Sequence, residues 1–167
     1  MSQDSLEALA ARVGGRLRDT GALLVTAESC TGGWVSQAVT AIAGSSEWFE
    51  RGFVVYSNAA KQELLGVRGE TLQQHGAVSE QTALELATGA LERSKGTISA
   101  AITGVAGPTG GSATKPVGFV CFAWATRQGA KSESRHFEGD REAVRRKSVE
   151  RALQGVLEAL DAGFPRA

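Results

Sequence analysis

The chain has 167 residues, of which 42% are hydrophobic and 22% are charged, as expected for one soluble globular domain spanning residues 1–167. Its 18 basic residues balance 18 acidic ones, which argues against nucleic acid or an anionic membrane surface as a partner. The apolar runs are too short to cross a bilayer, and two cysteines without a CxxC pair favour the cytoplasm. With two histidines in the chain, we expect no metal site.

Helical and apolar segments alternate from the N-terminus onward. Residues 6–17 repeat apolar side chains at helical spacing, and Gly21 ends this first helix. The run ALLVTA at residues 22–27 is continuous and apolar, which is typical of a buried parallel strand. Residues 32–42 are predicted to form a helix, closed by a turn at residues 43–46.

The middle of the chain repeats this alternation. The run GFVVYS at residues 52–57 predicts a second strand, and Asn58 is a candidate cap for a helix that continues through Leu65. Residues 79–94 are amphipathic and open with a capping serine. The apolar run TISAAIT at residues 97–103 predicts a third strand.

The C-terminal part of the chain predicts a hairpin and a long helix. Residues 118–126 and 132–137 are two further strands, joined at Gln128-Gly129, and residues 140–160 form the closing helix. Residues 163–167 are predicted to be a frayed tail. We therefore predict an α/β fold: a single-domain layered sandwich, whose mixed, mostly parallel sheet carries helices on its faces.

Three polar or glycine-rich segments each follow a predicted strand. They are ESCTGG at residues 28–33, YSNAAK at residues 56–61 and TGVAGPTGG at residues 103–111. Ligands of open α/β sheets bind at the carboxyl ends of the strands, where such segments gather. Their coincidence at one sheet edge indicates a functional site.

The first segment offers a nucleophile and donors for an anion. Either Ser29 or Cys30 is a candidate nucleophile, and the N-terminus of the following helix would favour a thiolate at Cys30. The amides of Thr31, Gly32 and Gly33 would face an anion or a developing oxyanion. The alternative is that Ser29 or Thr31 only caps the helix.

The second segment offers a base. A lysine such as Lys61, held near a serine in a partly dry site, can lose its proton and act as a general base, while Tyr56 would relay that proton or orient the lysine. The alternative is a surface lysine beside a half-buried aromatic ring. Neither a Tyr-x-x-x-Lys spacing nor a Gly-x-Ser-x-Gly motif is present, and two histidines do not assemble a Ser–His–Asp triad convincingly.

The third segment is a loop whose glycines suit a phosphate held by backbone amides, although a flexible surface loop is the alternative. These glycines are Gly104, Gly107, Gly110 and Gly111. Lys115 would add charge at the far end of the loop. Arg141 and Arg145 share a helix face and suit phosphate binding, although arginines on such a face commonly point into solvent.

Taken together, several motifs resemble the CinA C-terminal domain family. The motifs are TAESCTGG, GSSEWFERGFVVYSNAAK, HGAVSE, TGVAGPTGG, KPVG and GDREAVR, and the resemblance runs from about Leu6 to Leu160. Within the family, the chain is most similar to stand-alone nicotinamide-nucleotide amidohydrolases (NMN deamidases). The resemblance implies hydrolysis of nicotinamide mononucleotide (NMN) to nicotinate mononucleotide and ammonia for NAD recycling, with no cofactor.

The resemblance also implies residue roles. Ser29 would be the nucleophile, Lys61 its base, and Tyr56 an aid to proton transfer. The implied substrate-binding residues are Thr31, Gly32, Gly33, Ser46, Thr103, Gly104, Gly107, Gly110, Gly111, Arg141 and Arg145, with one of the two arginines meeting the phosphate. We also expect a homo-oligomer, with a dimer favoured. The alternatives are a nucleotide-binding regulatory module without turnover and an amidase for another carboxamide.

Overall fold

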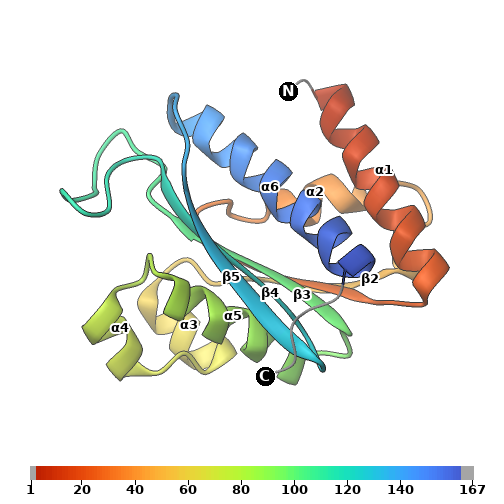
Figure 1. Ribbon diagram of the computed structural model, residues 1–167, viewed down its shortest axis with the longest axis horizontal. Helices are drawn as coiled ribbons and strands as arrows, with labels where there is room; N and C mark the ends of the chain where they lie inside the picture. The colour runs from red at the N-terminus through yellow and green to blue at the C-terminus, as the bar shows by residue number, and fades with distance from the viewer. Residues whose placement is uncertain (1–2, 163–167) are drawn as a thin grey trace.

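The computed structural model describes residues 3–162, in which one five-stranded sheet lies between two layers of helices (Figure 1). In spatial order, the strands are β2 (Phe49–Val54), β1 (Leu24–Glu28), β3 (Ile98–Gly104), β4 (Phe119–Thr126) and β5 (Gly129–His136). Strand β1 pairs in parallel with β2 and β3, whereas β4 pairs antiparallel with β3 and β5. Strand β4 thus runs against the other strands, which confirms the predicted mixed α/β sandwich.

The helices divide between the two faces of the sheet (Figure 1). One face carries α1 (Gln3–Thr20), α2 (Trp34–Thr40) and α6 (Arg141–Ala162), and the other carries α3 (Asn58–Leu65), α4 (Gly69–His75) and α5 (Glu80–Glu92). A short 3₁₀ turn, η1 (Ser45–Glu47), precedes β2. No helix within residues 3–162 combines the length and apolarity needed to cross a membrane.

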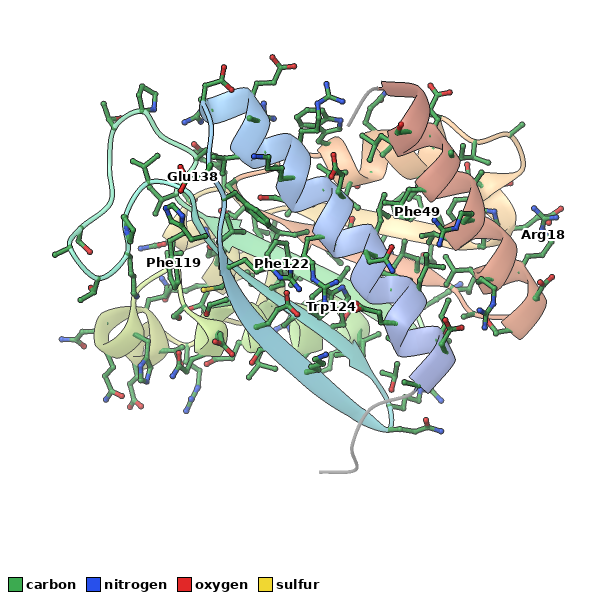
Figure 2. The ribbon with its side chains drawn as sticks, turned by 45° about the horizontal axis from the view of Figure 1, so that its top comes forward. Arg18, Phe49, Phe119, Phe122, Trp124 and Glu138 are labelled. Atoms are coloured by element: carbon green, nitrogen blue, oxygen red, sulfur yellow. The ribbon has the colours of Figure 1, made fainter. Side chains whose placement is uncertain are left out.

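Side chains of β4 alternate between the two cores, as the period of two in a strand requires. Phe122 and Trp124 point toward α6, with their rings stacked at 5.8 Å between centroids (Figure 2), whereas Cys121 and Ala123 pack on the α5 side. The Trp124 indole donates to the Ala152 carbonyl of α6 at 3.0 Å. This packing fixes the helix that carries Arg141 and Arg145.

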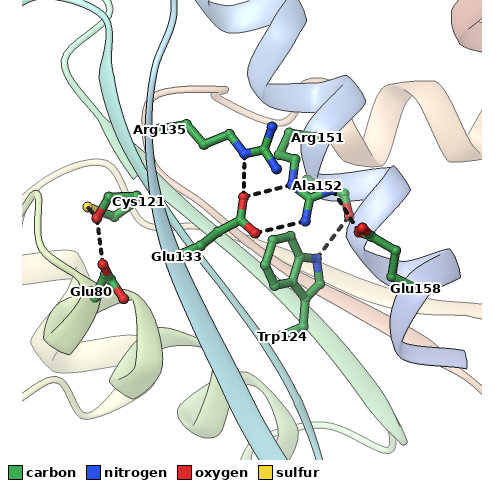
Figure 3. A network of polar contacts seen from close by, with 9 residues as sticks. Glu80, Cys121, Trp124, Glu133, Arg135, Arg151, Ala152 and Glu158 are labelled. Atoms are coloured by element: carbon green, nitrogen blue, oxygen red, sulfur yellow. Dashed lines mark hydrogen bonds and ion pairs between the residues drawn. The ribbon is translucent and has the colours of Figure 1, made fainter. Parts of the chain in front are cut away.

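An ionic network around the buried Arg151 adds a second attachment of α6 to the sheet (Figure 3). The Arg151 guanidinium donates to both Glu133 carboxylate oxygens at 2.7 and 2.8 Å, and to Glu158 at 2.7 Å. The same guanidinium lies 5.1 Å from the Trp124 ring centroid, and Arg135 donates to Glu133 from β5. Bidentate pairs of this kind restrict geometry, so the network holds α6 in register with the β4–β5 hairpin.

Two predicted segments shift by a few residues in the structure. Strand β2 begins and ends three residues before the predicted span 52–57, because its first half contains the charged residues Glu50 and Arg51, which interrupt the apolar pattern of this edge strand. Strand β5 begins at Gly129 rather than at residue 132, for the same reason.

The ends of the predicted helices also differ. Ser57, not Asn58, caps α3, since its hydroxyl accepts the Ala60 amide at 3.0 Å. The capping serine predicted at the start of residues 79–94 is confirmed, because the Ser79 hydroxyl accepts the Thr82 amide at 3.1 Å. The tail predicted at residues 163–167 lies outside the described residues.

Candidate active site

The loops that follow β1, β2 and β3 meet at the carboxyl edge of the sheet around a cavity of about 230 Å³. The residues that line it are Ser29, Cys30, Tyr56, Asn58, Lys61, Ala77, Val78, Thr103, Gly104, Ala106 and Arg141. All three predicted segments contribute to this lining, and Arg141, the first residue of α6, also lines the cavity. The edge of the sheet where the sequence indicates a site is therefore the edge at which the cavity lies.

Ser29 and Lys61 form a buried pair in this cavity. Lys61 Nζ lies 3.0 Å from Ser29 Oγ and donates a second hydrogen bond to the Tyr56 carbonyl at 2.9 Å. Their exposed fractions are 1% for Lys61 and 7% for Ser29. The lysine is therefore held by two contacts within hydrogen-bond reach of a hydroxyl, as a nucleophile and its base require.

Burial shifts the pKa of Lys61 and of Cys30 in opposite directions. Desolvation lowers the pKa of Lys61 below 10.5, against a smaller raising effect of Cys30, so the neutral amine forms at a lower pH than in a free lysine. The pKa of Cys30 is raised to about 12, because the effect of desolvation is larger than the lowering effects of a backbone hydrogen bond and of the nearby Arg145. The expected thiolate at Cys30 is therefore wrong, because the buried thiol keeps its proton, and Ser29 is the better nucleophile candidate.

A buried glutamate occupies the N-terminus of α2. The Glu28 carboxylate accepts the Val35 and Ser36 amides at 2.8 and 2.9 Å, and the hydroxyls of Thr31 and Ser36 at 2.7 Å each. Sequence reasoning missed this contact, although an acid just before a helix is the residue type that satisfies orphan amides. Glu28 thus satisfies two free amides in the first turn of α2, and these are not the Thr31, Gly32 and Gly33 amides that were expected to face an anion.

Two glycines form the turn between β1 and α2. Gly32 and Gly33 have φ values of +58° and +102°, a region that L side chains rarely adopt, so α2 starts at Trp34 rather than at residue 32. The Gly32 amide donates to the Ser29 carbonyl at 3.0 Å. The expectation that the Gly32 amide faces an anion is therefore wrong, because the turn itself uses that donor.

The side chain of Tyr56 is not placed to relay a proton between Ser29 and Lys61, although this had been predicted. Its side chain is 62% exposed, and its hydroxyl accepts from Arg141 Nη2 at 3.5 Å. Among the described residues, the hydrogen bonds of this hydroxyl include none to Ser29 or Lys61. The backbone carbonyl of Tyr56, rather than its phenol, orients the lysine.

The two candidate arginines on α6 have different surroundings. Arg141 lines the cavity and donates to the Gly107 carbonyl at 2.6 Å. Arg145 donates instead to the carbonyls of Cys30 and Thr31, both at 3.1 Å, and is absent from the lining. Of the two, Arg141 is the one whose side chain lines the cavity.

The third predicted segment reaches the cavity only through its first residues. Thr103 and Gly104 line it, and the Thr103 hydroxyl donates to the Ala77 carbonyl at 2.8 Å. The loop then leads away from the sheet at the left of Figure 1, where Gly110 and Gly111 are exposed and outside the lining. Lys115 donates to the His75 carbonyl at the end of α4. The glycine loop therefore does not wrap around the cavity along its whole length.

Ser46 is not brought to this cavity. It is an exposed residue of η1, which leads into the amino end of β2, whereas the cavity lies at the carboxyl ends of β1, β2 and β3. Asn58, Ala77 and Val78 line the cavity but were not predicted as site residues from the sequence. They belong to YSNAAK and HGAVSE, whose presence among the matching motifs was the available signal. Within residues 3–162, no group of three or more His, Cys, Asp or Glu side chains has metal-binding proximity.

The fold and the site together define an α/β sandwich protein with a buried serine–lysine pair at the carboxyl edge of its sheet. The chain belongs to the CinA C-terminal domain family, whose model matches residues 6–160.

Two relatives are similar to this chain over almost their whole length. The chain is 54% identical to nicotinamide-nucleotide amidohydrolase PncC of Escherichia coli strain K12 over 155 residues, which cover 92% of this chain and 94% of that protein. It is 48% identical to the protein of the same name from Pseudomonas putida, over 93% of this chain and 97% of that protein.

Solved structures give the same result. The competence damage-inducible protein A from Klebsiella pneumoniae matches with a TM-score of 0.92 and 39% identity, over 95% of this chain and 99% of that one. The competence/damage inducible protein CihA from Agrobacterium tumefaciens matches with a TM-score of 0.89 and 47% identity, over 93% and 95%. The expectations of this family and of its α/β fold are confirmed.

Proposed function

We propose that this chain hydrolyses the carboxamide of NMN, giving nicotinate mononucleotide and ammonia in the recycling of pyridine nucleotides. Relatives that are 54% and 48% identical carry the name nicotinamide-nucleotide amidohydrolase, which supports an amidohydrolase acting on this class of substrate. The observation that carries the mechanism is the distance of 3.0 Å between Lys61 Nζ and Ser29 Oγ in a buried pair.

In the proposed mechanism, the neutral amine of Lys61 accepts the proton of Ser29 as the oxygen attacks the carboxamide carbon. The resulting ammonium then donates that proton to the leaving nitrogen, so that ammonia departs and a nicotinoyl ester of Ser29 forms. Water, deprotonated by the same lysine, then attacks the ester carbon. The ammonium returns this proton to the departing Ser29 oxygen, so nicotinate mononucleotide is released and both residues regain their starting states. Neither step consumes a cofactor or needs a metal ion.

The backbone at the nucleophile supplies donors for the tetrahedral oxyanion. The amides of Cys30 and Thr31 directly follow Ser29, whereas the Gly32 amide is bonded to the Ser29 carbonyl. Preorganised amides of this kind commonly contribute factors of about 10²–10³ in kcat. The Tyr56 carbonyl restrains Lys61 at 2.9 Å, so the base keeps its orientation while the proton moves.

The size of the cavity fits the reacting end of the nucleotide. Its volume of about 230 Å³ falls below the roughly 300–1,000 Å³ of pockets that bury whole drug-sized ligands. We therefore infer that the pyridine ring enters and the phosphate stays at the mouth, where the side chains of Tyr56 and Arg141 are exposed. Arginine matches a phosphate with two parallel donors.

Ammonia release from NMN by the purified protein tests this proposal, with nicotinamide riboside and nicotinamide as comparison substrates and a chelator in a parallel sample. We expect turnover that survives the chelator and prefers the nucleotide, and we expect Arg141→Gln to reduce that preference roughly tenfold or more. Saturable NMN binding without ammonia would instead indicate a regulatory module, and release from another carboxamide alone would indicate a different amidase.

A further inference from the structure

Arg145 contacts the backbone of the turn that carries Ser29, without lining the cavity. Its Nε and Nη2 atoms donate to the carbonyls of Cys30 and Thr31, each at 3.1 Å. Its guanidinium also lies 5.3 Å from the ring centroid of Trp34, the first residue of α2. One side chain of α6 thereby contacts two residues of the β1–α2 connection and the first residue of α2.

Glu28 also holds this turn and the helix that follows it. Its carboxylate accepts the Thr31 hydroxyl of the turn and the Val35 and Ser36 amides of α2, whereas Arg145 donates to carbonyls of the turn. The turn is thus fixed between an acceptor group and a donor group, and charge-assisted hydrogen bonds are about twice as strong as neutral ones. The two carbonyls that accept from Arg145 belong to the two residues that follow Ser29.

We propose that Arg145 is a positioning residue for the hydrolysis. It fixes the backbone of residues 29–33, which we call the nucleophile turn, and thereby orients the Ser29 hydroxyl and the amides of Cys30 and Thr31. This proposal rests on the proposed function. We assign the phosphate to Arg141 and not to Arg145, because Arg145 does not line the cavity and points its Nε and one Nη2 N–H at the two carbonyls.

The bond to the Cys30 carbonyl has a further effect on the oxyanion. This carbonyl shares its peptide group with the Thr31 amide, so a cationic donor on the oxygen draws electron density away from that N–H. Arg145 therefore aligns the Thr31 donor and also strengthens it. Its contribution concerns the nucleophile turn, so it is equal for any carboxamide that reaches Ser29.

The neighbouring Arg146 offers a matched control. Its guanidinium lies 5.1 Å from the same Trp34 ring, and its Nη2 pairs with Glu142 at 3.5 Å. It has the same charge and stands on the same helix, but none of its described contacts reaches residues 29–33. A comparison of the two arginines separates positioning of the turn from general effects of charge or of Trp34 packing.

The test compares Arg145→Gln, Arg145→Lys and Arg146→Gln by steady-state kinetics on NMN and on nicotinamide riboside. A misplacement of about 1 Å costs up to roughly a hundredfold. We therefore expect Arg145→Gln to lower kcat by roughly 10- to 100-fold on both substrates alike, with little change in KM. Arg145→Lys should recover part of this loss, since an ammonium still donates to a carbonyl, and Arg146→Gln should stay within about twofold of wild type.

A loss confined to NMN, seen as a raised KM, would make Arg145 a phosphate ligand and overturn the proposal, as would unchanged kinetics. If Arg145→Gln does not fold, the lysine variant decides between these outcomes. A second readout does not depend on NMN: the rate at which a fluorophosphonate probe modifies Ser29, followed by mass spectrometry. Slower labelling of Arg145→Gln supports the positioning role even if wild type leaves NMN intact, a result that would overturn the proposed substrate alone. Absence of Ser29 labelling in wild type would overturn both proposals.

Discussion

Replacement of Glu28 by glutamine removes the negative charge and one acceptor oxygen at the N-terminus of α2, while the size and shape of the side chain stay almost the same. The carboxylate accepts four hydrogen bonds of 2.7–2.9 Å, two on each oxygen, with one amide and one hydroxyl in each pair. A glutamine keeps one oxygen, and its NH₂ group faces the other pair. The hydroxyl there can rotate to accept, but the buried backbone amide loses its partner.

The cost of this substitution follows from these contacts. A lost charged hydrogen bond costs about 1.5–3 kcal/mol and an unsatisfied buried amide about 1–3 kcal/mol, so we expect a destabilisation of roughly 3–5 kcal/mol. For a domain of this size, this corresponds to a fall in Tm of roughly 6–20 °C. Circular dichroism melts of wild type, Glu28→Gln and the exposed control Glu47→Gln measure it. The control should stay within about 0.5 kcal/mol, and a fall of less than about 2 °C for Glu28→Gln would refute the capping role.

Three further predictions concern the site and the core. The kcat/KM for NMN should rise with pH and level off above the pKa of Lys61, because burial places that pKa below 10.5 and the base must be neutral; a profile that falls with pH over this limb would contradict a lysine base. At pH 7.5, Cys30 should react with iodoacetamide far more slowly than a free thiol, since its pKa is about 12; rapid site-resolved alkylation would show an activated thiol. Gly155→Ala should lower the free energy of unfolding by roughly 1–3 kcal/mol, because the added Cβ would meet the Trp124 ring at 2.1 Å; an unchanged urea midpoint would refute this packing.

Local pattern was enough to predict the strands that carry the site. Strands β1 and β3 are continuous apolar runs in the sequence because each has neighbours on both sides and helices on both faces, so nearly every side chain is buried. The edge strands β2 and β5 expose many of their residues and were misplaced by about three residues each. The β1–α2 turn was predictable because Gly32 and Gly33 adopt positive φ values.

The individual contacts at the site depend on tertiary structure and could not be predicted from the sequence. Arg141 and Arg145 stand one helical turn apart with the same side chain, and only the approach of α6 to the sheet edge separates their surroundings. Tyr56 contacts Lys61 through its carbonyl, a group that every residue carries, so no residue pattern marks it. The thiol of Cys30 keeps its proton because the surrounding core desolvates it, an effect that no local motif encodes.

In the proposed mechanism, Ser29 and Lys61 act as one unit in hydrolysing the carboxamide of NMN. Steady-state ammonia release by Ser29→Ala, Lys61→Ala and the double variant measures this coupling. Each single variant should lose nearly all turnover while circular dichroism shows an unchanged fold, and the double variant should be little worse than either, because residues that form one catalytic unit have non-additive effects. Substantial turnover by a folded Ser29→Ala protein, or losses that multiply in the double variant, would contradict this serine–lysine mechanism.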